Sequence, residues 1–129
     1  MLIDTTLLDS VTQQACNSGR LRMNLNFHPS PGSKSQRLLN AIEPGSVVPT
    51  HRHLHTGETY ILLRGKMCVY FYNEAGAITE TFDLDPLQGR YGVDIPAGQW
   101  HSLTVLAPGT VMFEVKDGPY MPLSAGDMR

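Results

Sequence analysis

The chain has 129 residues, ten of them basic and twelve acidic, and a formal charge of −2 at pH 7. This length suits one domain with a core and a ligand cavity, while the dispersed charges offer no basic stripe for nucleic acid and no polybasic patch for a membrane surface. The first residues lack the pattern of a signal peptide, and no apolar run is long enough to cross a bilayer. We therefore expect a cytoplasmic protein with neither nucleic acid nor membrane as a partner.

The first expected element is a helix within residues 1–19. Asp4 or Thr5 can cap its start, apolar residues recur on one face up to about Ser18, and Gly19 stops it. This helix should pack outside the rest of the fold. The chain has only two cysteines, too few for a disulfide scaffold, and we expect both to be free thiols.

Residues 20–116 are typical of an all-β domain. Nine prolines and twelve glycines separate short β-branched and aromatic runs, which favours many strands with tight turns. Strands are predicted near residues 20–28, 36–43, 58–64, 67–73, 77–84, 91–95, 100–106 and 110–116. The turn residues 73–76 predict a hairpin between the fourth and fifth of these strands. Residues 117–129 read as an irregular tail that either covers the mouth of the cavity or hangs free.

Metal-ligand residue types are concentrated between two turn glycines. Gly45, His51, His53, Glu58 and Gly65 follow the pattern G-x5-H-x-H-x4-E-x6-G, and a second cluster at residues 96–101 ends in another histidine, at position 101. Together they supply three imidazoles and one carboxylate. Histidines near a turn can also be plain surface residues, and the full spacing is what favours a metal site here.

Strand geometry predicts how these side chains converge. Residues two apart on a strand share a face, so His51 and His53 should point the same way. Glu58 has the wrong parity on an unbroken strand, but a turn or bulge at residues 56–57 would restore it. His101 must arrive from a distant strand. His55 shares the parity of the other two histidines, but its place just before the turn favours exposure.

The predicted ligands His51, His53, Glu58 and His101 suit one divalent transition metal such as zinc, iron, manganese or nickel. A coordination position left open would admit water or substrate. Glu58 has two open interpretations, as a ligand or as a catalytic base. Tyr60 should face inward with Glu58, where it either offers its phenol to a substrate or fills the core.

The run from Gly45 to Gly65 resembles the first motif of the cupin superfamily at each signature position. The second cupin motif is matched at Pro96, Gly98 and His101, with Arg90 in place of a glycine and Val105 in place of an asparagine. This resemblance implies one cupin domain over residues 1–129, built as a small double-stranded β-barrel (a jelly roll) with one N-terminal helix. It also implies a homodimer as one way of covering exposed sheet edges.

More narrowly, the chain resembles the WbuC family of cupin-fold metalloproteins. The matching segments are the leading helix, the sequence RMNLNFH at 22–28, Gln36-Arg37, and PTHRH at 49–53. That family is associated with bacterial surface-polysaccharide (O-antigen) gene clusters. The resemblance therefore implies a role in lipopolysaccharide biosynthesis without naming a reaction.

Further polar residues are candidates for substrate binding. Arg22, Asn26 and His28 alternate on one strand face and either form a polar wall of the cavity or a solvated edge. Arg37 could hold an anionic group through its guanidinium, although most arginines lie on the surface. Gln99 shares parity with His101 and either faces the site or lies in an exposed turn. The next residue, Trp100, should face outward into a helix or dimer contact.

Three functions remain open from the sequence. The first is a metal-dependent enzyme, of isomerase or epimerase type, that acts on a small polar metabolite such as a sugar or sugar nucleotide. The second is a non-catalytic cupin that binds a metal and a small ligand. The third is an iron-dependent oxygenase. In each case a small molecule is the expected partner.

Overall fold

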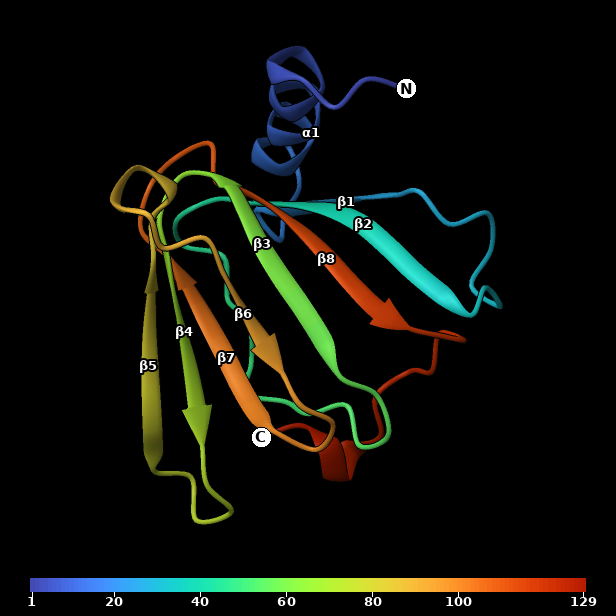
Figure 1. Ribbon diagram of the computed structural model, residues 1–129, viewed down its shortest axis with the longest axis vertical. Coiled ribbons are helices and arrows are strands. Elements are labelled where there is room, and N and C mark those ends of the chain that lie inside the picture. The colour runs from blue at the N-terminus through green and yellow to red at the C-terminus, as the bar shows by residue number, and fades with distance from the viewer.

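A computed structural model describes residues 1–129 as one helix and eight strands in two antiparallel sheets. The larger sheet has the order β1-β2-β8-β3-β6 and the smaller has the order β5-β4-β7 (Figure 1). The elements are α1 (Thr5–Cys16), β1 (Arg22–Asn26), β2 (Ser35–Ile42), β3 (Glu58–Arg64), β4 (Met67–Tyr72), β5 (Ile78–Leu84), β6 (Gly92–Ile95), β7 (Trp100–Val105) and β8 (Val111–Asp117). Short 3-10 turns lie at Pro86–Gln88 and Ala125–Asp127.

The all-β prediction with one N-terminal helix is confirmed, and each predicted strand is present within about two residues of its expected ends. The hairpin at residues 73–76 also forms, with the Gly76 amide donating to the Asn73 carbonyl at 3.0 Å and Gly76 at a φ of +85°. The two sheets do not close into a continuous barrel. No continuous ladder joins them, and His51 of the β2–β3 loop pairs with His101 of β7 through an isolated bridge. The jelly roll is therefore open at its edges.

The helix α1 packs outside the sheets, as predicted. Its buried face carries Leu8, Val11 and Ala15, which join Leu39 and Val111 on the outer face of the large sheet in a small second core. The Asp4 side chain caps the helix by accepting from the Leu7 amide at 3.0 Å. The helix ends at Cys16, two residues before the predicted Ser18. No helix of the protein is both long and apolar enough to span a bilayer.

The main core lies between the two sheets and occupies one end of the space between them. It contains Ile42, Leu62 and Met112 from the large sheet and Met67, Val69, Phe71, Leu103 and Val105 from the small sheet. Towards the other end of the same strands, the inward positions become polar. On β3 the inward residues run from Leu62 through Tyr60 to Glu58, and on β8 from Met112 to Glu114 and Lys116. The apolar end therefore stabilises the fold, while the polar end offers side chains that can bind a ligand.

The C-terminal tail is docked rather than free. The Arg52 amide donates to the Asp127 carbonyl at 3.0 Å, and the Arg129 amide donates to the Thr50 carbonyl at 2.9 Å. The tail thus lies beside the segment that contains His51, and the C-terminus lies near the start of β7, far from α1 (Figure 1). Of the two alternatives for residues 117–129, the one that places the tail over the polar end is correct. Cys16 and Cys68 are free thiols, as predicted.

Candidate metal site

The four predicted ligands lie together at the polar end of the fold. One ligand atom from each of His51, His53, Glu58 and His101 can be chosen so that all lie within 4.8 Å of one another. A shared metal ion about 2.0–2.2 Å from each atom would need separations up to about 4.4 Å, so shifts of a few tenths of an ångström suffice. These side chains come from the β2–β3 loop, the first residue of β3 and the second residue of β7.

Backbone pairing brings the distant histidine to the loop. The His51 amide donates to the His101 carbonyl at 3.0 Å, and the His101 amide donates back to the His51 carbonyl at 2.9 Å. Between His53 and Glu58 the chain bends at Leu54 and His55, two residues before the turn predicted at residues 56–57. A Cβ on Gly57 would lie 3.0 Å from the Ile95 carbonyl oxygen, so the chain then runs close against β6. The bend therefore corrects the parity of Glu58.

The imidazoles of His51 and His101 are each held through Nδ1 by a backbone carbonyl. His51 Nδ1 lies 2.8 Å from the Pro49 carbonyl oxygen, and His101 Nδ1 lies 2.8 Å from the Gln99 carbonyl oxygen. A carbonyl can only accept, so each Nδ1 carries the proton and donates it. In a neutral ring Nε2 then carries the lone pair, whereas the 2.8 Å contact of His101 Nε2 with Glu58 is a hydrogen bond only when Nε2 is protonated as well. Donation from Nδ1 to a carbonyl is the arrangement in which histidine ligands of metals are usually held.

The Glu58 carboxylate is almost completely buried, at 3% exposure, and one of its oxygens has no partner. Oε1 accepts from the Tyr60 hydroxyl at 2.8 Å and lies 2.8 Å from His101 Nε2. Oε2 lies 3.6 Å from His53 Nε2 and makes no hydrogen bond. An unpartnered buried carboxylate oxygen is costly unless something else binds it. The donor set therefore fits a bound divalent cation.

The protonation states favour cation binding. Burial lowers the pKa of His53 to about 4, and burial together with the nearby His101 lowers the pKa of His51. Burial alone would raise the pKa of Glu58, but the hydrogen bond and the charge of His101, with the charge of His53, outweigh it and lower the pKa. At pH 7 His51 and His53 are therefore neutral and Glu58 is ionised, as metal ligands need to be.

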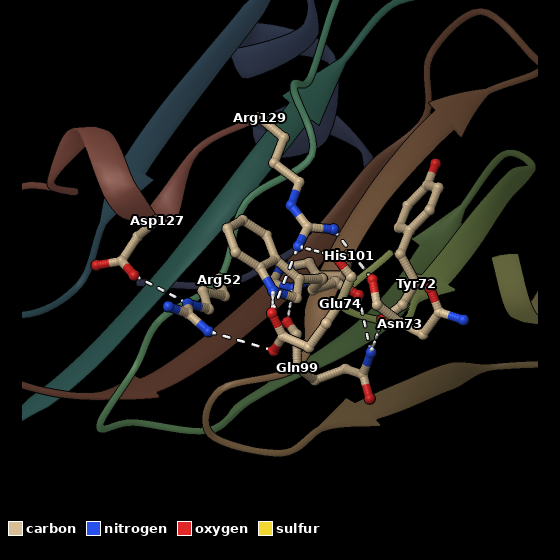
Figure 2. Close-up of polar contacts among 9 residues, drawn as sticks. Arg52, Tyr72, Asn73, Glu74, Gln99, His101, Asp127 and Arg129 are labelled. Carbon is tan, nitrogen blue, oxygen red and sulfur yellow. Dashed lines mark hydrogen bonds and ion pairs between the residues drawn. The ribbon is translucent and has the colours of Figure 1, made fainter. Parts of the chain in front are cut away.

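Four charged side chains gather around the tryptophan next to His101. We call this cluster the Trp100 clamp: Arg52, Glu74, Trp100, Asp127 and Arg129. Arg52 Nε donates to Asp127 at 2.9 Å, and Arg52 Nη1 lies 3.5 Å from Glu74 (Figure 2). Arg129 Nη2 reaches the same glutamate, donating to its carbonyl at 2.6 Å. The guanidinium carbons of Arg52 and Arg129 lie 4.6 Å and 3.9 Å from the centre of the Trp100 ring.

Trp100 faces outward, as predicted, and the tail and the β2–β3 loop cover it there. Arg129 of the tail and Arg52 of the loop stack on the indole, which is 4% exposed. Since Arg52 follows His51 and Trp100 precedes His101, the clamp joins the backbones of two ligands to the tail.

Tyr60 lies inside the cluster. Besides its bond to Glu58, its hydroxyl lies 3.4 Å from His101 Nε2, and the side chain is 3% exposed. Burial and the charge of Glu58 raise the pKa of Tyr60 well above its ordinary value. Its proton therefore stays on the phenol, and the residue acts as a hydrogen-bond donor to Glu58.

The structure does not bring Gln99, Arg37 and Arg22 to the metal ligands. The Gln99 amide donates to the carbonyls of Tyr72 and Trp100, so only its backbone contacts His101 (Figure 2). Arg37 has the parity of Leu39 and is exposed on the outer face of the large sheet. Arg22 lines a separate depression beside the end of α1.

Asn26 and His28 do line a polar cavity of about 330 Å³, which also contains two inward residues of β8 that the sequence analysis missed. These residues are Glu114 and Lys116. Burial and the charge of Glu58 raise the pKa of Glu114 to about 7. The available signal was their alternation with Val111, Phe113 and Val115, which places charged residues on the inward face of a strand.

Comparisons with known proteins agree with this architecture. The family model described as "Domain of unknown function (DUF6016)" matches residues 3–84, which include His51, His53 and Glu58. No curated protein matches the sequence.

Solved structures with the same architecture are distant in sequence. KdgF from Halomonas sp. is 16% identical, with 74% of this chain and 79% of that chain covered and a TM-score of 0.60. A cupin superfamily protein from Desulfitobacterium hafniense is 17% identical, with coverage of 74% and 76% and a TM-score of 0.59. The capsular polysaccharide assembling protein CapF from Staphylococcus aureus is 20% identical, with coverage of 78% and 30% and a TM-score of 0.60. At these identities the likeness establishes the cupin fold alone.

Proposed function

The chain belongs to the family described as "Domain of unknown function (DUF6016)", and from its site we propose a metal-dependent cupin that acts on a small polar metabolite such as a sugar or sugar nucleotide. The observation that carries this proposal is the buried, unpartnered oxygen of Glu58 among three imidazoles. Two of those imidazoles, His51 and His101, have Nδ1 tied to a carbonyl, so that Nε2 is the nitrogen on each ring that can bind a metal. Such a constellation is costly in a folded protein unless it binds a cation.

The proposed ligands are His51, His53, Glu58 and His101. A divalent transition metal bound there would polarise a substrate oxygen or lower the pKa of a bound water. Around it, Tyr60 keeps its proton and orients Glu58 through the 2.8 Å hydrogen bond. The apolar core beyond Leu62 and Met112 excludes water from one side of the site. These residues fit proton transfer next to a polarised oxygen, the chemistry of an isomerase or epimerase.

Two independent likenesses support a carbohydrate substrate. The sequence segments that resemble the WbuC family point to surface-polysaccharide biosynthesis, and CapF is named as a protein of capsular polysaccharide assembly. This chain spans 30% of the length of CapF, so that protein's role enters here as part of the proposal. A cytoplasmic location would suit a sugar nucleotide as substrate.

The test is elemental analysis of protein purified without a metal-affinity tag, with His51→Ala compared to the wild type. We expect about one equivalent of one transition metal in the wild type and less than a tenth of that in the variant, since a ligand is lost. His55→Ala is the matched control, because His55 is an exposed histidine outside the cluster, and it should retain the metal. A wild type that stays below a tenth of an equivalent, even after incubation with zinc, iron, manganese and nickel in turn, would refute the proposal.

A further inference from the structure

The polar cavity of about 330 Å³ lies between β1, β2, β8 and the tail. Its polar lining includes Asn24, Asn26, His28, Glu114, Lys116 and Tyr120. Only two hydrophobic residues border it. A cavity so rich in amides, with one ammonium and one carboxyl group, suits a ligand with many hydrogen-bonding groups better than an apolar one.

Strand register connects this cavity to the metal ligands. Glu58 on β3 is paired with Lys116 on β8, and Lys116 is paired with Gln36 on β2. Two residues along the strands, Tyr60 lies opposite Glu114. Neighbouring strands lie about 4.8 Å apart, so the row from Glu58 to the β2 side of the cavity spans about 10 Å. That is the reach of one monosaccharide with a substituent.

Lys116 stands at the junction of the two regions. It also lines a second cavity of about 260 Å³ that borders His53 and the tail. Its ammonium makes no hydrogen bond or ion pair within the protein, and it lies 5.9 Å from the centre of the Tyr120 ring, which lines the same cavity. A cation that is not neutralised by a carboxylate and lies beside a concave polar surface is available for an anionic group of a ligand.

His28 offers a hydrogen-bond donor to the same cavity. Its Nδ1 lies 3.1 Å from both the amide nitrogen and the carbonyl oxygen of Arg37. The carbonyl already accepts from the Phe27 amide at 2.8 Å, whereas the Arg37 amide has the imidazole as its acceptor. Nδ1 therefore accepts, and the proton of the neutral ring is on Nε2. Asn24 and Asn26 add amides whose side chains make no hydrogen bond within the protein, and Asn40 has a buried, unpartnered Oδ1 next to Glu114.

We propose that this cavity binds the body of an anionic monosaccharide unit, with Lys116 holding its carboxylate or phosphate and Asn24, Asn26 and His28 binding its hydroxyl groups. The opposite side of the same unit would then face the metal ligands across Glu58 and Tyr60. This inference deepens the proposed function by naming a substrate class. It assigns specificity to residues of β1 and β8 that do not contact the metal.

The test follows the side-chain amide signals of Asn24 and Asn26 in ¹⁵N–¹H spectra during titration. Sodium glucuronate, sodium galacturonate and glucose 1-phosphate are the anionic probes, and glucose is the neutral one. We expect saturable shifts of these signals with at least one anionic probe, with a Kd on the order of 1 mM, and at least fivefold weaker binding of glucose. Binding by the uronates alone would identify a carboxylate at Lys116, and binding by glucose 1-phosphate alone a phosphate.

Variants separate the roles. Lys116→Met should weaken anionic binding about tenfold or more, and Lys34→Met, which changes an exposed lysine that does not line the cavity, should leave it within twofold. Asn26→Ala, which leaves the charge of the cavity unchanged, should weaken the binding of all the sugars without affecting the preference for an anionic one. The inference is overturned if no anionic probe gives saturable shifts, if the shifts lie outside the cavity, or if Lys116→Met binds as the wild type does.

The same titration with His51→Ala distinguishes this inference from the proposed function. The cavity residues are not metal ligands, so anionic sugars should still shift the Asn24 and Asn26 signals in that variant. Metal binding without sugar binding would refute the cavity proposal alone. Sugar binding by a protein that holds no metal would support the cavity proposal and refute the metal-dependent function.

Discussion

The guanidinium carbon of Arg129 lies 3.9 Å from the centre of the Trp100 ring, which couples the last residue of the tail to the residue beside His101. Arg129 also donates to the backbone of residues 73 and 74, at the turn between β4 and β5. Both contacts are with the small sheet, which contains β4, β5 and β7, so the tail that leaves β8 of the large sheet is anchored on the small one. Cation–π contacts of this kind contribute about 0.5–1 kcal/mol at accessible sites.

Arg129→Ala should release the tail from Trp100. Trp100 is the single tryptophan of the chain, so its fluorescence reports the contact directly. We expect a red-shifted emission maximum, stronger quenching by acrylamide and a loss of about 1 kcal/mol in the free energy of unfolding, since a stacked cation and two backbone hydrogen bonds are removed. Arg20→Ala, at an exposed arginine away from the tail, is the control. An unchanged spectrum in Arg129→Ala would mean that the tail is held without this contact.

Metal removal should destabilise the protein. A ligand that binds only the folded state at one hundred times its Kd adds about 2.7 kcal/mol, which corresponds to a rise in Tm of about 5–10 °C for a domain of this size. We expect this rise when zinc is added to chelator-treated wild type and to His55→Ala, and its absence in His53→Ala. Thermal unfolding followed by circular dichroism measures it. An equal rise in His53→Ala would show that the metal binds elsewhere.

Mild acid should weaken the metal-free protein. The pKa of His53 is about 4 in the folded state and that of an ordinary histidine is about 6.5, so between these values the unfolded chain binds more protons than the folded one. Stability is then fully present above about pH 6.5 and falls as the pH approaches 4, by about 1–3 kcal/mol. Urea unfolding at pH 7.5 and pH 5 tests this. A smaller pH dependence is expected in His53→Gln, and an equal one would assign the effect to other groups.

Tyr60→Phe should weaken the metal site while leaving the fold intact. The change removes the donor to Glu58 Oε1, and lost contacts of this kind reduce metal affinity by about tenfold or more. Competition with a chromogenic chelator measures the affinity. Tyr72→Phe is the matched control, because its hydroxyl bonds Ser102 on the other face of the small sheet. Equal affinities in the two variants would contradict the assignment of Tyr60 as the residue that orients Glu58.

Glu114→Gln should stabilise the metal-free protein at pH 8 and change it little at pH 5. The folded-state pKa of Glu114 is raised from 4.5 to about 7, so between these values the folded chain keeps a proton that the unfolded chain loses. Its contribution therefore falls as the pH rises through this window, and a neutral amide avoids the cost. We expect a gain of about 1–3 kcal/mol at pH 8 by urea unfolding. Glu80→Gln, on an exposed strand position, should show no such pH dependence.

The period-2 alternation of short apolar runs was sufficient to predict the eight strands. Each strand turns one face to the core, so its own sequence carries the alternation of apolar and polar residues. The helix that packs outside was equally local, since Asp4 supplies its cap. The open arrangement of the two sheets was not predictable from the strand pattern, because it depends on which edges pair and not on what each strand contains.

The candidate site shows where local patterns stop. His51, His53, Glu58 and His101 were identified from spacing, and their role as ligands stays a prediction that the elemental analysis tests. Parity placed Trp100 outward correctly, but it could not show that the tail, far away in the sequence, covers that face.

Residues of β8 were missed for a related reason. Lys116 and Glu114 alternate with apolar residues that look like a core face, and which side of β8 faces inward depends on its pairing with β2 and β3. Arg37 shares the parity of Leu39 and is exposed on the outer face, which is the surface position that the sequence analysis left open for it. A sequence alone does not fix these long-range pairings.

The four metal-ligand candidates are held with unequal rigidity, which bears on how fast an ion enters and leaves. Glu58 and His101 belong to strands with continuous ladders, whereas His51 belongs to a loop held by single bridges to residue 101 and to Met128 of the tail. Detachment of the tail would free the loop without unfolding either sheet. The rate of metal exchange should therefore follow the rate at which the tail opens locally. The imidazoles and the carboxylate set the affinity for the ion, whereas residues that never touch the ion set how fast it enters and leaves.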